Sequence, residues 1–153
     1  MLDIGDKVPD IRLPSSSGKD VSLTDYKGKK IVLYFYPKDD TPGCTTEACE
    51  FRDAVKTYEG LNAVIIGVSK DSLKSHDKFM AKYNLPFELL SDEDLKLMEF
   101  FGVWKEKTMY GKTFLGVNRS TFLIDEKGVI VKAWRNVKVS SHVAEVLDEI
   151  KKL

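Results

Sequence analysis

The two cysteines of the chain, Cys44 and Cys49, stand together in the stretch PKDDTPGCTTEACEF at residues 37–51. A thiolate can act as a nucleophile, a redox partner or a metal ligand. Pro42 and Gly43 predict a turn just before Cys44, and the residues that follow have helical spacing. We therefore expect Cys44 in the first turn of a helix, where unpaired backbone N–H groups and the helix dipole favour the thiolate.

Ionisation of this thiol cannot by itself account for a rapid reaction. A free thiol is only a few per cent ionised at neutral pH, so full ionisation raises the reactive fraction by roughly thirty-fold, or about 2 kcal/mol. Groups that stabilise the charge of the transition state must contribute as well. Thr41 and the backbone N–H groups of residues 43 and 44 are local candidates, and a cation from elsewhere in the chain would complete the set.

The spacing of the two cysteines disfavours a permanent bond between them. Residues five apart in a helix have Cα atoms about 8–9 Å apart, whereas a disulfide needs less than about 7 Å. Cys44 and Cys49 can therefore bond only if one or two turns of the helix unwind. We expect a transient disulfide that forms after Cys44 has reacted.

Two hydrophobic segments bracket the cysteines. IVLYFYP at 31–37 and NAVIIGVS at 62–69 are runs of β-branched and aromatic residues, typical of strands buried on both faces. Between them, small and apolar residues recur at helical spacing until Gly60 ends the pattern. This β-α-β unit predicts parallel strands, and it places Cys44 at the carboxyl end of the first strand, where α/β proteins bind ligands.

The rest of the chain supplies further strands and helices. We predict a helix over 71–84, a short strand over 87–92, and a helix over 91–103 that begins with a Ser-x-x-Asp capping pattern. A hairpin is predicted over 120–135 around DEKG, and an amphipathic helix over 140–153. This order predicts an α/β fold with a mixed central sheet flanked by helices.

Length and composition restrict the class of protein. We expect a single domain over residues 1–153 with an N-terminal β-hairpin extension around SSSG, and we assign no element to residues 103–118. Lys+Arg and Asp+Glu both number 24, so the formal net charge is zero and nothing favours a nucleic-acid partner. No apolar run suits a membrane span and no leader opens the chain, so we expect a cytoplasmic protein. In that compartment, paired cysteines indicate redox chemistry or metal binding.

Residues beyond the cysteine pair complete a larger pattern. Pro37, Thr41 and Cys44 form Pro-x-x-x-Thr-x-x-Cys, and VNRSTFLID places Arg119 just before a predicted strand. These residues and the position of Cys49 resemble the peroxiredoxins, specifically the bacterioferritin comigratory or Q-type branch. The opening GDKVPDIRLPSSSGKDVSLTDYKGK and the closing SHVAEVL are also similar to this branch, so the resemblance covers essentially the whole chain.

The resemblance implies a thioredoxin-like fold and a thiol-dependent peroxidase for hydrogen peroxide and organic hydroperoxides. Cys44 would attack the O–O bond and become a sulfenic acid. Thr41 Oγ and the Cys44 backbone N–H would bind the peroxide. Arg119 would hold the thiolate and the departing oxygen, and Pro37 would shield the pocket from water. Cys49 would resolve the sulfenic acid as an intramolecular disulfide, which a thioredoxin-type dithiol would reduce.

The same resemblance implies that no metal, haem or flavin is required. It also suggests a monomer or weak dimer, because resolution takes place within one chain. The physiological role would be antioxidant defence and redox homeostasis.

The same residues also have less specific interpretations. From the sequence alone, Cys44 could be an inert buried thiol, Cys49 could fill the core, and Arg119 could be a surface residue. Glu47 follows Cys44 by three residues and lies on the same helix face. It could orient Arg119 or simply favour the helix N-terminus, and we leave it outside the predicted site.

The main alternative function is a dithiol–disulfide oxidoreductase acting on proteins, which would share the fold. The Cys-x-x-Cys spacing typical of thioredoxins is absent, which counts against it. A redox sensor or chaperone-like binding module would use the same thiol switch without turning over peroxide. A metal site is disfavoured because two thiols without a nearby histidine do not complete a tetrahedral shell. His76 and His142 are both expected in solvent.

Overall fold

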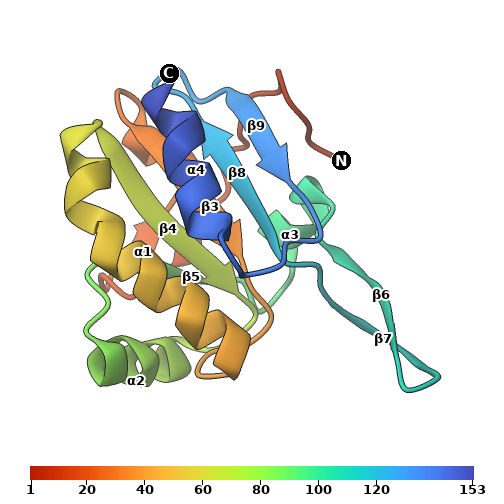
Figure 1. Ribbon diagram of the computed structural model, residues 1–153. Coiled ribbons are helices and arrows are strands. Elements are labelled where there is room, and N and C mark those ends of the chain that lie inside the picture. Colours follow the sequence, from red (N-terminus) through yellow and green to blue (C-terminus); the bar gives the residue numbers. More distant parts are fainter.

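A mixed sheet of five strands forms the centre of the molecule (Figure 1). The computed structural model describes residues 1–153. The strands lie in the order β5-β4-β3-β8-β9; β3 pairs parallel with β4, β4 parallel with β5, β3 antiparallel with β8, and β8 antiparallel with β9. Their bounds are β3 (Lys30–Phe35), β4 (Ala63–Ser69), β5 (Glu88–Ser91), β8 (Ser120–Ile124) and β9 (Ile130–Trp134). The predicted mixed sheet and its parallel β-α-β unit are confirmed.

β3 lies at the centre because both of its faces are apolar. Side chains alternate across a strand, so Val32 and Tyr34 point to one side of the sheet, and Ile31, Leu33 and Phe35 to the other. All five side chains are at most 2% exposed. Each side of the sheet therefore carries its own hydrophobic core.

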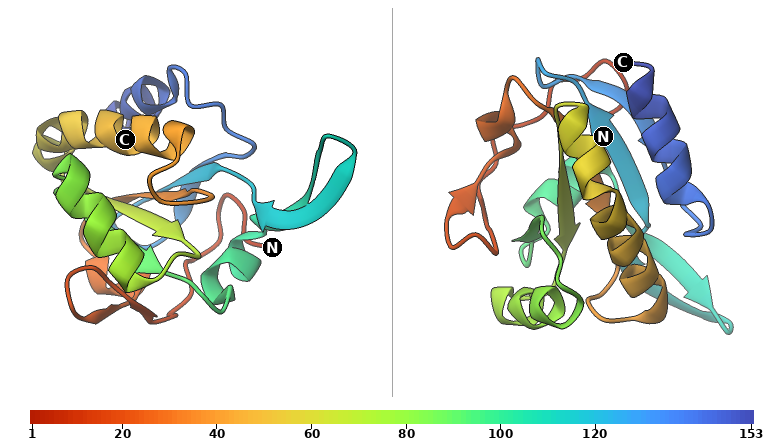
Figure 2. Two further views of the ribbon diagram at one scale, coloured as in Figure 1. Left: turned by 90° about the horizontal axis from the view of Figure 1, so that it is seen from below. Right: turned by 60° about the vertical axis from the view of Figure 1, so that its left-hand side comes forward.

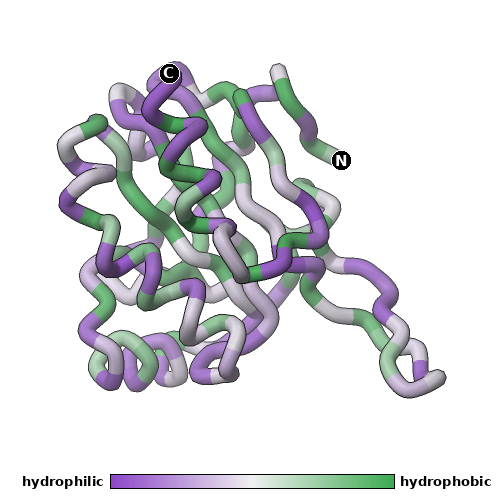
Figure 3. Tube along the Cα trace, in the orientation of Figure 1, coloured by the Kyte–Doolittle hydropathy of each residue, from purple (hydrophilic) through white to green (hydrophobic).

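Helices α1 (Pro42–Gly60) and α4 (His142–Lys151) lie side by side over the face that Tyr34 occupies (Figures 1 and 2). Helix α2 (Leu73–Tyr83) adds Phe79 to the same core. Groups of hydrophobic and hydrophilic residues alternate along α4 (Figure 3), as its predicted amphipathic pattern requires. None of the helices combines the length and the apolar composition that crossing a membrane demands.

The N-terminal segment and α3 cover the opposite face of the sheet. β1 (Leu13–Pro14) and β2 (Asp20–Val21) pair as the predicted N-terminal hairpin, and a 3-10 turn, η1 (Leu23–Tyr26), follows them. Apolar residues of this segment and of α3 (Lys96–Phe101) join the core around Leu33. The extension is therefore part of the core rather than an appendage.

The helix predicted over 91–103 is wrong at its start. β5 runs through Ser91, and α3 begins only after Leu95, whose left-handed backbone (φ 62°) separates the helix from the strand. The expected Ser-x-x-Asp pair does not cap it. Instead, Asp92 Oδ2 accepts a hydrogen bond from the backbone N–H of Met98 at 2.8 Å.

A second hairpin occupies the segment for which no element is predicted. β6 (Trp104–Met109) and β7 (Lys112–Val117) pair only with each other and project from the body of the molecule (Figure 1). Tyr110 and Gly111 form the turn between them, with φ of 52° and 75°. Two-residue hairpin turns favour Asn-Gly or Asp-Gly, so a tyrosine at the first position conceals this turn in the sequence.

Candidate active site

Cys44 lies in the first turn of α1, as predicted. The helix begins at Pro42, and Thr41 is its N-cap residue. Proline suits the first helical position because an N–H there would have no helical partner. Cys44 is 1% exposed and packs in the core that also contains Ala48. Its thiol is therefore buried at the end of the helix where backbone N–H groups lack helical partners.

The topology of the sheet brings Arg119 to this thiol. β3 and β8 are antiparallel and Phe35 pairs with Ser120, so the start of β8 lies beside the end of β3. Arg119 immediately precedes β8, and its Nη2 lies 3.3 Å from Cys44 Sγ. The cation that the sequence requires from elsewhere in the chain is therefore present.

A buried carboxylate holds this arginine in place. Arg119 Nη1 donates a hydrogen bond to Glu47 Oε1 at 2.7 Å, and Glu47 is fully buried. The guanidinium thus bridges the Cys44 thiol and the Glu47 carboxylate, which lie three residues apart on one face of α1. Of the two interpretations of Glu47, the structure supports the one in which it orients Arg119.

Burial and the ion pair act on Glu47 in opposite directions. Burial raises the pKa of Glu47 to about 7, although the charge and hydrogen bond of Arg119 pull the pKa down. Burial also opposes the charge of Arg119, but the charges of Glu47 and Cys44 outweigh it, and the pKa of Arg119 is raised. Glu47 Oε2 and the hydroxyl of Tyr34 are buried without a hydrogen-bond partner. Such strongly perturbed and incompletely satisfied groups are typical of reactive sites.

Gly43 leaves the space that this arrangement needs. A Cβ atom at residue 43 would lie 3.2 Å from Arg119 Nη2 and 3.8 Å from a methyl carbon of Val139. The first of these contacts is so tight that the guanidinium would have to shift by a few tenths of an ångström. Glycine at this position therefore lets Arg119 approach the first turn of α1 and reach Cys44.

The other predicted residues of the cysteine segment lie in the same region. The hydroxyl of Thr41 makes no capping hydrogen bond; Thr41 Oγ1 donates to the backbone oxygen of Lys38 at 2.8 Å. Pro37 is partly exposed in the loop between β3 and α1. The structure thus places Thr41 at the start of the helical turn that carries Cys44, whereas no hydrogen bond links Pro37 to Cys44 or Arg119.

Cys49 lies five residues beyond Cys44, partly buried and with a free thiol. Helix α1 is continuous from Pro42 to Gly60. The two thiols therefore cannot bond while the helix is intact. In the structure both thiols are free and the helix between them is intact.

The prediction that His76 and His142 lie in solvent is wrong, because they are 0% and 2% exposed. His142 Nε2 lies 2.7 Å from Thr121 Oγ1. Burial, assisted by the charge of Arg119, lowers the pKa of His142 to about 4, so this ring is neutral at physiological pH. His76 stands three residues before the buried Phe79 on α2, and this helical spacing is the signal that could have revealed its burial.

A buried thiol at a helix N-terminus, held by an arginine on a mixed α/β sheet, defines a class of protein: thiol-dependent enzymes that activate cysteine for redox chemistry. The model of the AhpC/TSA family matches residues 4–133. The chain therefore belongs to the AhpC/TSA family, and within it to the Bcp or Q-type peroxiredoxins.

Individual relatives and solved structures agree with this assignment. The chain is 58% identical over 150 residues to "Peroxiredoxin Bcp" of Bacillus subtilis, covering 98% of this chain and 96% of that protein. A structure of a cysteine-to-serine mutant of Xylella fastidiosa PrxQ superposes with a TM-score of 0.94 at 46% identity, covering 99% of this chain and 97% of the other. The bacterioferritin comigratory protein of Xanthomonas campestris superposes with a TM-score of 0.92 at 45% identity, and the match covers 98% of each chain. The structures of that protein concern its alkyl peroxide reduction activity.

These findings confirm the expected thioredoxin-like fold and the expected class of enzyme. Peroxiredoxins are thiol peroxidases, so the chain is an enzyme that reduces peroxides with electrons from thiols. Membership of this family implies a peroxide substrate and a thioredoxin-type reductant.

Proposed function

We propose that Cys44 is the peroxidatic cysteine and that Arg119, held by Glu47, makes it reactive. The observation that carries this proposal is the 3.3 Å contact between Arg119 Nη2 and Cys44 Sγ, with Arg119 Nη1 bound to buried Glu47. A fixed cation beside the sulfur stabilises the thiolate and, in the transition state, the charge that develops on the peroxide oxygens. Because Glu47 already fixes the guanidinium, little reorganisation accompanies the reaction.

The first step transfers one oxygen atom to Cys44. The thiolate electron pair forms an S–O bond with the terminal peroxide oxygen as the O–O bond breaks. The other oxygen leaves with the electrons of that bond and takes up a proton, which gives water or an alcohol. Cys44 becomes a sulfenic acid, and the hydroperoxide has gained two electrons. Arg119, whose Nη2 lies 3.3 Å from the sulfur, would stabilise the departing oxygen.

Binding of the peroxide falls to the turn around Cys44. Its backbone N–H is one of the unpaired donors of the first helical turn and would donate to a peroxide oxygen. The Thr41 hydroxyl already donates its proton to the backbone oxygen of Lys38, so it would accept a hydrogen bond from the peroxide O–H. Pro37, which lacks an N–H group, would shield the loop side of this pocket from water.

The second step closes a disulfide within one chain. The first turns of α1 unwind, the thiol of Cys49 attacks the sulfenic sulfur of Cys44, and water leaves with the sulfenic oxygen. A thioredoxin-type dithiol then reduces the disulfide by thiol–disulfide exchange and becomes oxidised itself. Because both cysteines belong to one chain, one domain over residues 1–153 suffices, and we expect a monomer or weak dimer.

Alkyl hydroperoxides are proposed as substrates beside hydrogen peroxide, since the structures of the Xanthomonas homologue concern alkyl peroxide reduction. The cytoplasm is the expected place of action, because thiol reductants maintain reduced cysteines there.

One experiment tests this proposal directly. The reduced protein receives a stoichiometric amount of hydrogen peroxide, and its free thiols and intact mass are measured within seconds. We expect loss of both thiols, a mass lower by two hydrogens and no crosslinked dimer. Two surviving thiols at unchanged mass would mean that the site does not activate peroxide, and the protein-disulfide or sensor functions would then be favoured.

Two variants separate the roles of the cysteines. Cys44→Ser should abolish peroxide consumption because it removes the nucleophile. Cys49→Ser should react once with peroxide, retain a sulfenic acid at Cys44 and fail to turn over with thioredoxin. Substantial consumption by the first variant, or normal cycling by the second, would contradict the assigned roles.

A further inference from the structure

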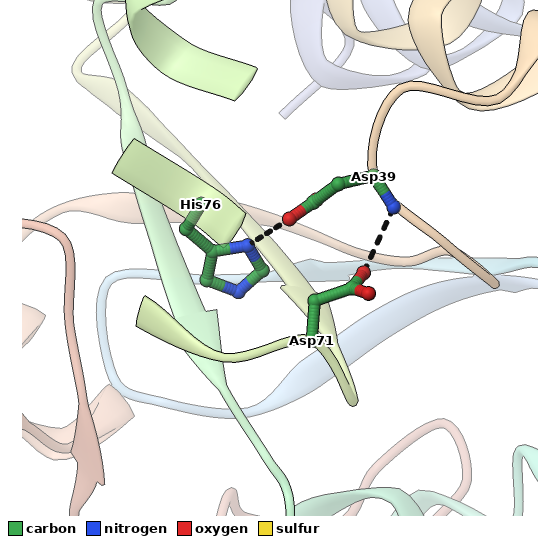
Figure 4. Close-up of side chains that lie close together, drawn as sticks. All are labelled: Asp39, Asp71 and His76. Atoms are coloured by element: carbon green, nitrogen blue, oxygen red, sulfur yellow. Dashed lines mark hydrogen bonds and ion pairs between the residues drawn. The ribbon is translucent and has the colours of Figure 1, made fainter. Parts of the chain in front are cut away.

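A buried network of polar side chains joins the loop in front of Cys44 to α2 (Figure 4). Asp39 lies in this loop, five residues before Cys44, and is 7% exposed. His76 of α2 is fully buried, and its Nδ1 lies 2.7 Å from Asp39 Oδ2. The backbone N–H of Asp39 donates to Asp71 Oδ2 at 2.8 Å. The peroxidase chemistry proposed above uses none of these three side chains.

Both ring nitrogens of His76 face oxygen acceptors. Nδ1 faces the Asp39 carboxylate, and Nε2 lies 2.9 Å from the backbone oxygen of Leu90. A neutral imidazole has one N–H and can donate to only one of them. The Asp39 carboxylate also accepts from the hydroxyls of Tyr36 at 2.6 Å and Ser75 at 2.8 Å. All of these contacts are satisfied when His76 is an imidazolium paired with an ionised Asp39.

The hydrogen bonds argue for an ion pair here rather than for a metal site. Asp39, Asp71 and His76 each have a potential ligand atom within 4.8 Å of the others. Each of these atoms already has hydrogen-bond partners, however. Asp39 Oδ2 faces Ser75 and His76, and Asp71 Oδ2 accepts from Ser69 Oγ at 2.7 Å as well as from the Asp39 N–H.

We propose that the His76–Asp39 ion pair is a positioning device that fixes the loop of residues 37–41 against α2 and thereby sets the start of α1 for catalysis. This inference rests on the proposed roles of Cys44 and Cys49. When the first turns of α1 unwind for disulfide formation, the pair holds the chain on the upstream side of the unwound turns. The intact site then re-forms from a fixed starting point after reduction.

The proton of His76 makes the device sensitive to pH. Burial lowers the pKa of His76, but the hydrogen bond and charge of Asp39, the carbonyl of Leu90 and the charge of Asp71 outweigh burial, and the pKa is raised. The ring also lies beside Tyr36, whose hydroxyl is held by Asp39, while β5 contributes a backbone oxygen. A raised histidine pKa means that the stabilisation is present below it and is lost as the pH rises through it. The loop is then released above the pKa of His76.

NMR tests the charge of His76 without reference to peroxidase activity. The chain contains two histidines, so their imidazole nitrogens can be assigned in the reduced, ¹⁵N-labelled protein between pH 6 and pH 10. We expect His76 to carry protons on both nitrogens at pH 7. His142 is the internal contrast, because it stays neutral down to about pH 4. A neutral His76 at pH 7 would overturn the proposal.

Asp39→Asn removes the ion pair but can keep the hydrogen bonds, so it is the control variant for measurements of peroxidase activity. Its amide can donate to Nδ1 of a neutral His76 while Nε2–H still donates to Leu90, so the geometry survives without the ion pair. In the wild type, we expect the second-order rate constant for peroxide to fall by about tenfold above the His76 midpoint, because small displacements of a catalytic turn are costly. In Asp39→Asn this fall should disappear.

The positioning role would be contradicted if the rate constant of Asp39→Asn still fell with rising pH. It would also be contradicted if the midpoint of the fall in the wild type differed from the His76 midpoint measured by NMR. The NMR result stands even where that variant folds poorly. Failure of the proposed function would look different: Cys44→Ser would still consume peroxide, while the spectrum of His76 would remain that of an imidazolium.

Discussion

Arg119 and Glu47 act as one unit at the thiol. Separate nitrogens of the guanidinium contact Glu47 Oε1 at 2.7 Å and Cys44 Sγ at 3.3 Å. A lysine would have to make both contacts from its single ammonium nitrogen, without the planar fork of arginine. Glu47 is thus a positioning residue: it does not touch the sulfur, but it determines where the cation beside the sulfur lies.

The pKa of Glu47 has a consequence for stability that Glu47→Gln should remove. Burial raises the pKa of Glu47 to about 7, from an ordinary value of 4.5. A carboxyl whose pKa is higher in the folded protein contributes stability that is fully present below pH 4.5 and is lost as the pH rises to about 7. The free energy of unfolding changes by something on the order of 3 kcal/mol over this range. Glutamine does not titrate, yet it keeps an oxygen that can accept from Arg119.

We therefore expect Glu47→Gln to gain stability relative to the wild type between pH 5 and pH 8. Urea unfolding of both proteins at several pH values measures the difference in the free energy of unfolding. A difference that stays constant across this range would show that Glu47 keeps its ordinary titration in the fold.

At the scale of the element, helix α1 has two conflicting tasks. Intact, its N-terminus presents Cys44 to Arg119 and the substrate, and it keeps Cys49 out of bonding distance. Partly unwound, it would bring the two sulfurs together. The balance between the two states should therefore set the rate of resolution without affecting the rate of the peroxide step.

A matched pair of substitutions at Thr46 tests this balance. Thr46 is exposed on α1 between the two cysteines, and its hydroxyl donates to the backbone oxygen of Pro42 at 3.0 Å. Thr46→Ala and Thr46→Gly both lose this hydroxyl, but glycine is about 1 kcal/mol less favourable in a helix. We expect disulfide formation to be about fivefold faster in Thr46→Gly than in Thr46→Ala, because unwinding is easier.

Rapid quenching followed by intact mass measurement gives the rates of sulfenic acid and disulfide formation separately. The rate of sulfenic acid formation is the control, and it should be the same in both variants. Equal rates of disulfide formation would mean that unwinding of α1 does not limit resolution.

Local signals explain why some elements could be predicted and others could not. β3 and the turn before Cys44 are encoded by neighbouring residues, so the sequence alone reveals them. The contact between Arg119 and Glu47 spans 72 residues, and no local pattern could show it. The helical spacing from Phe79 could indicate that His76 is buried, but its hydrogen-bond partners Asp39 and Leu90 are brought to its ring only by the folded chain.

At the scale of the whole molecule, the two cores and the projecting hairpin contribute unequally to stability. The cores lie on the two sides of the sheet and contain fully buried aromatic residues such as Phe51 and Phe122. The β6–β7 hairpin pairs only with itself, and Tyr110 at its turn is 96% exposed. We infer that the fold holds together without the outer part of this hairpin.

Deleting residues 106–109 and 112–115 would join Lys105 and Gly116 through the native Tyr110–Gly111 turn and preserve the pairing of this strand position. The free energy of unfolding should change by about 1 kcal/mol or less, because the deleted residues pair with each other and make only one hydrogen bond to a retained residue, from Lys107 to the backbone of Val117. Phe51→Ala, which empties a buried site, should cost about 3–5 kcal/mol and serves as the contrast.

The shortened protein should also react with peroxide at the wild-type rate. Its Arg119 remains anchored by Glu47, and the base of the hairpin remains tied by the hydrogen bond from the Asn118 N–H to Val103, 2.7 Å long. Urea unfolding and the single-turnover rate with hydrogen peroxide measure the two quantities. Unchanged stability with a slow peroxide step would mean that the outer hairpin takes part in binding the substrate, whereas a large loss of stability would mean that it is part of the fold. Both would contradict the view that the sheet, α1 and the Glu47–Arg119 pair suffice to build the site.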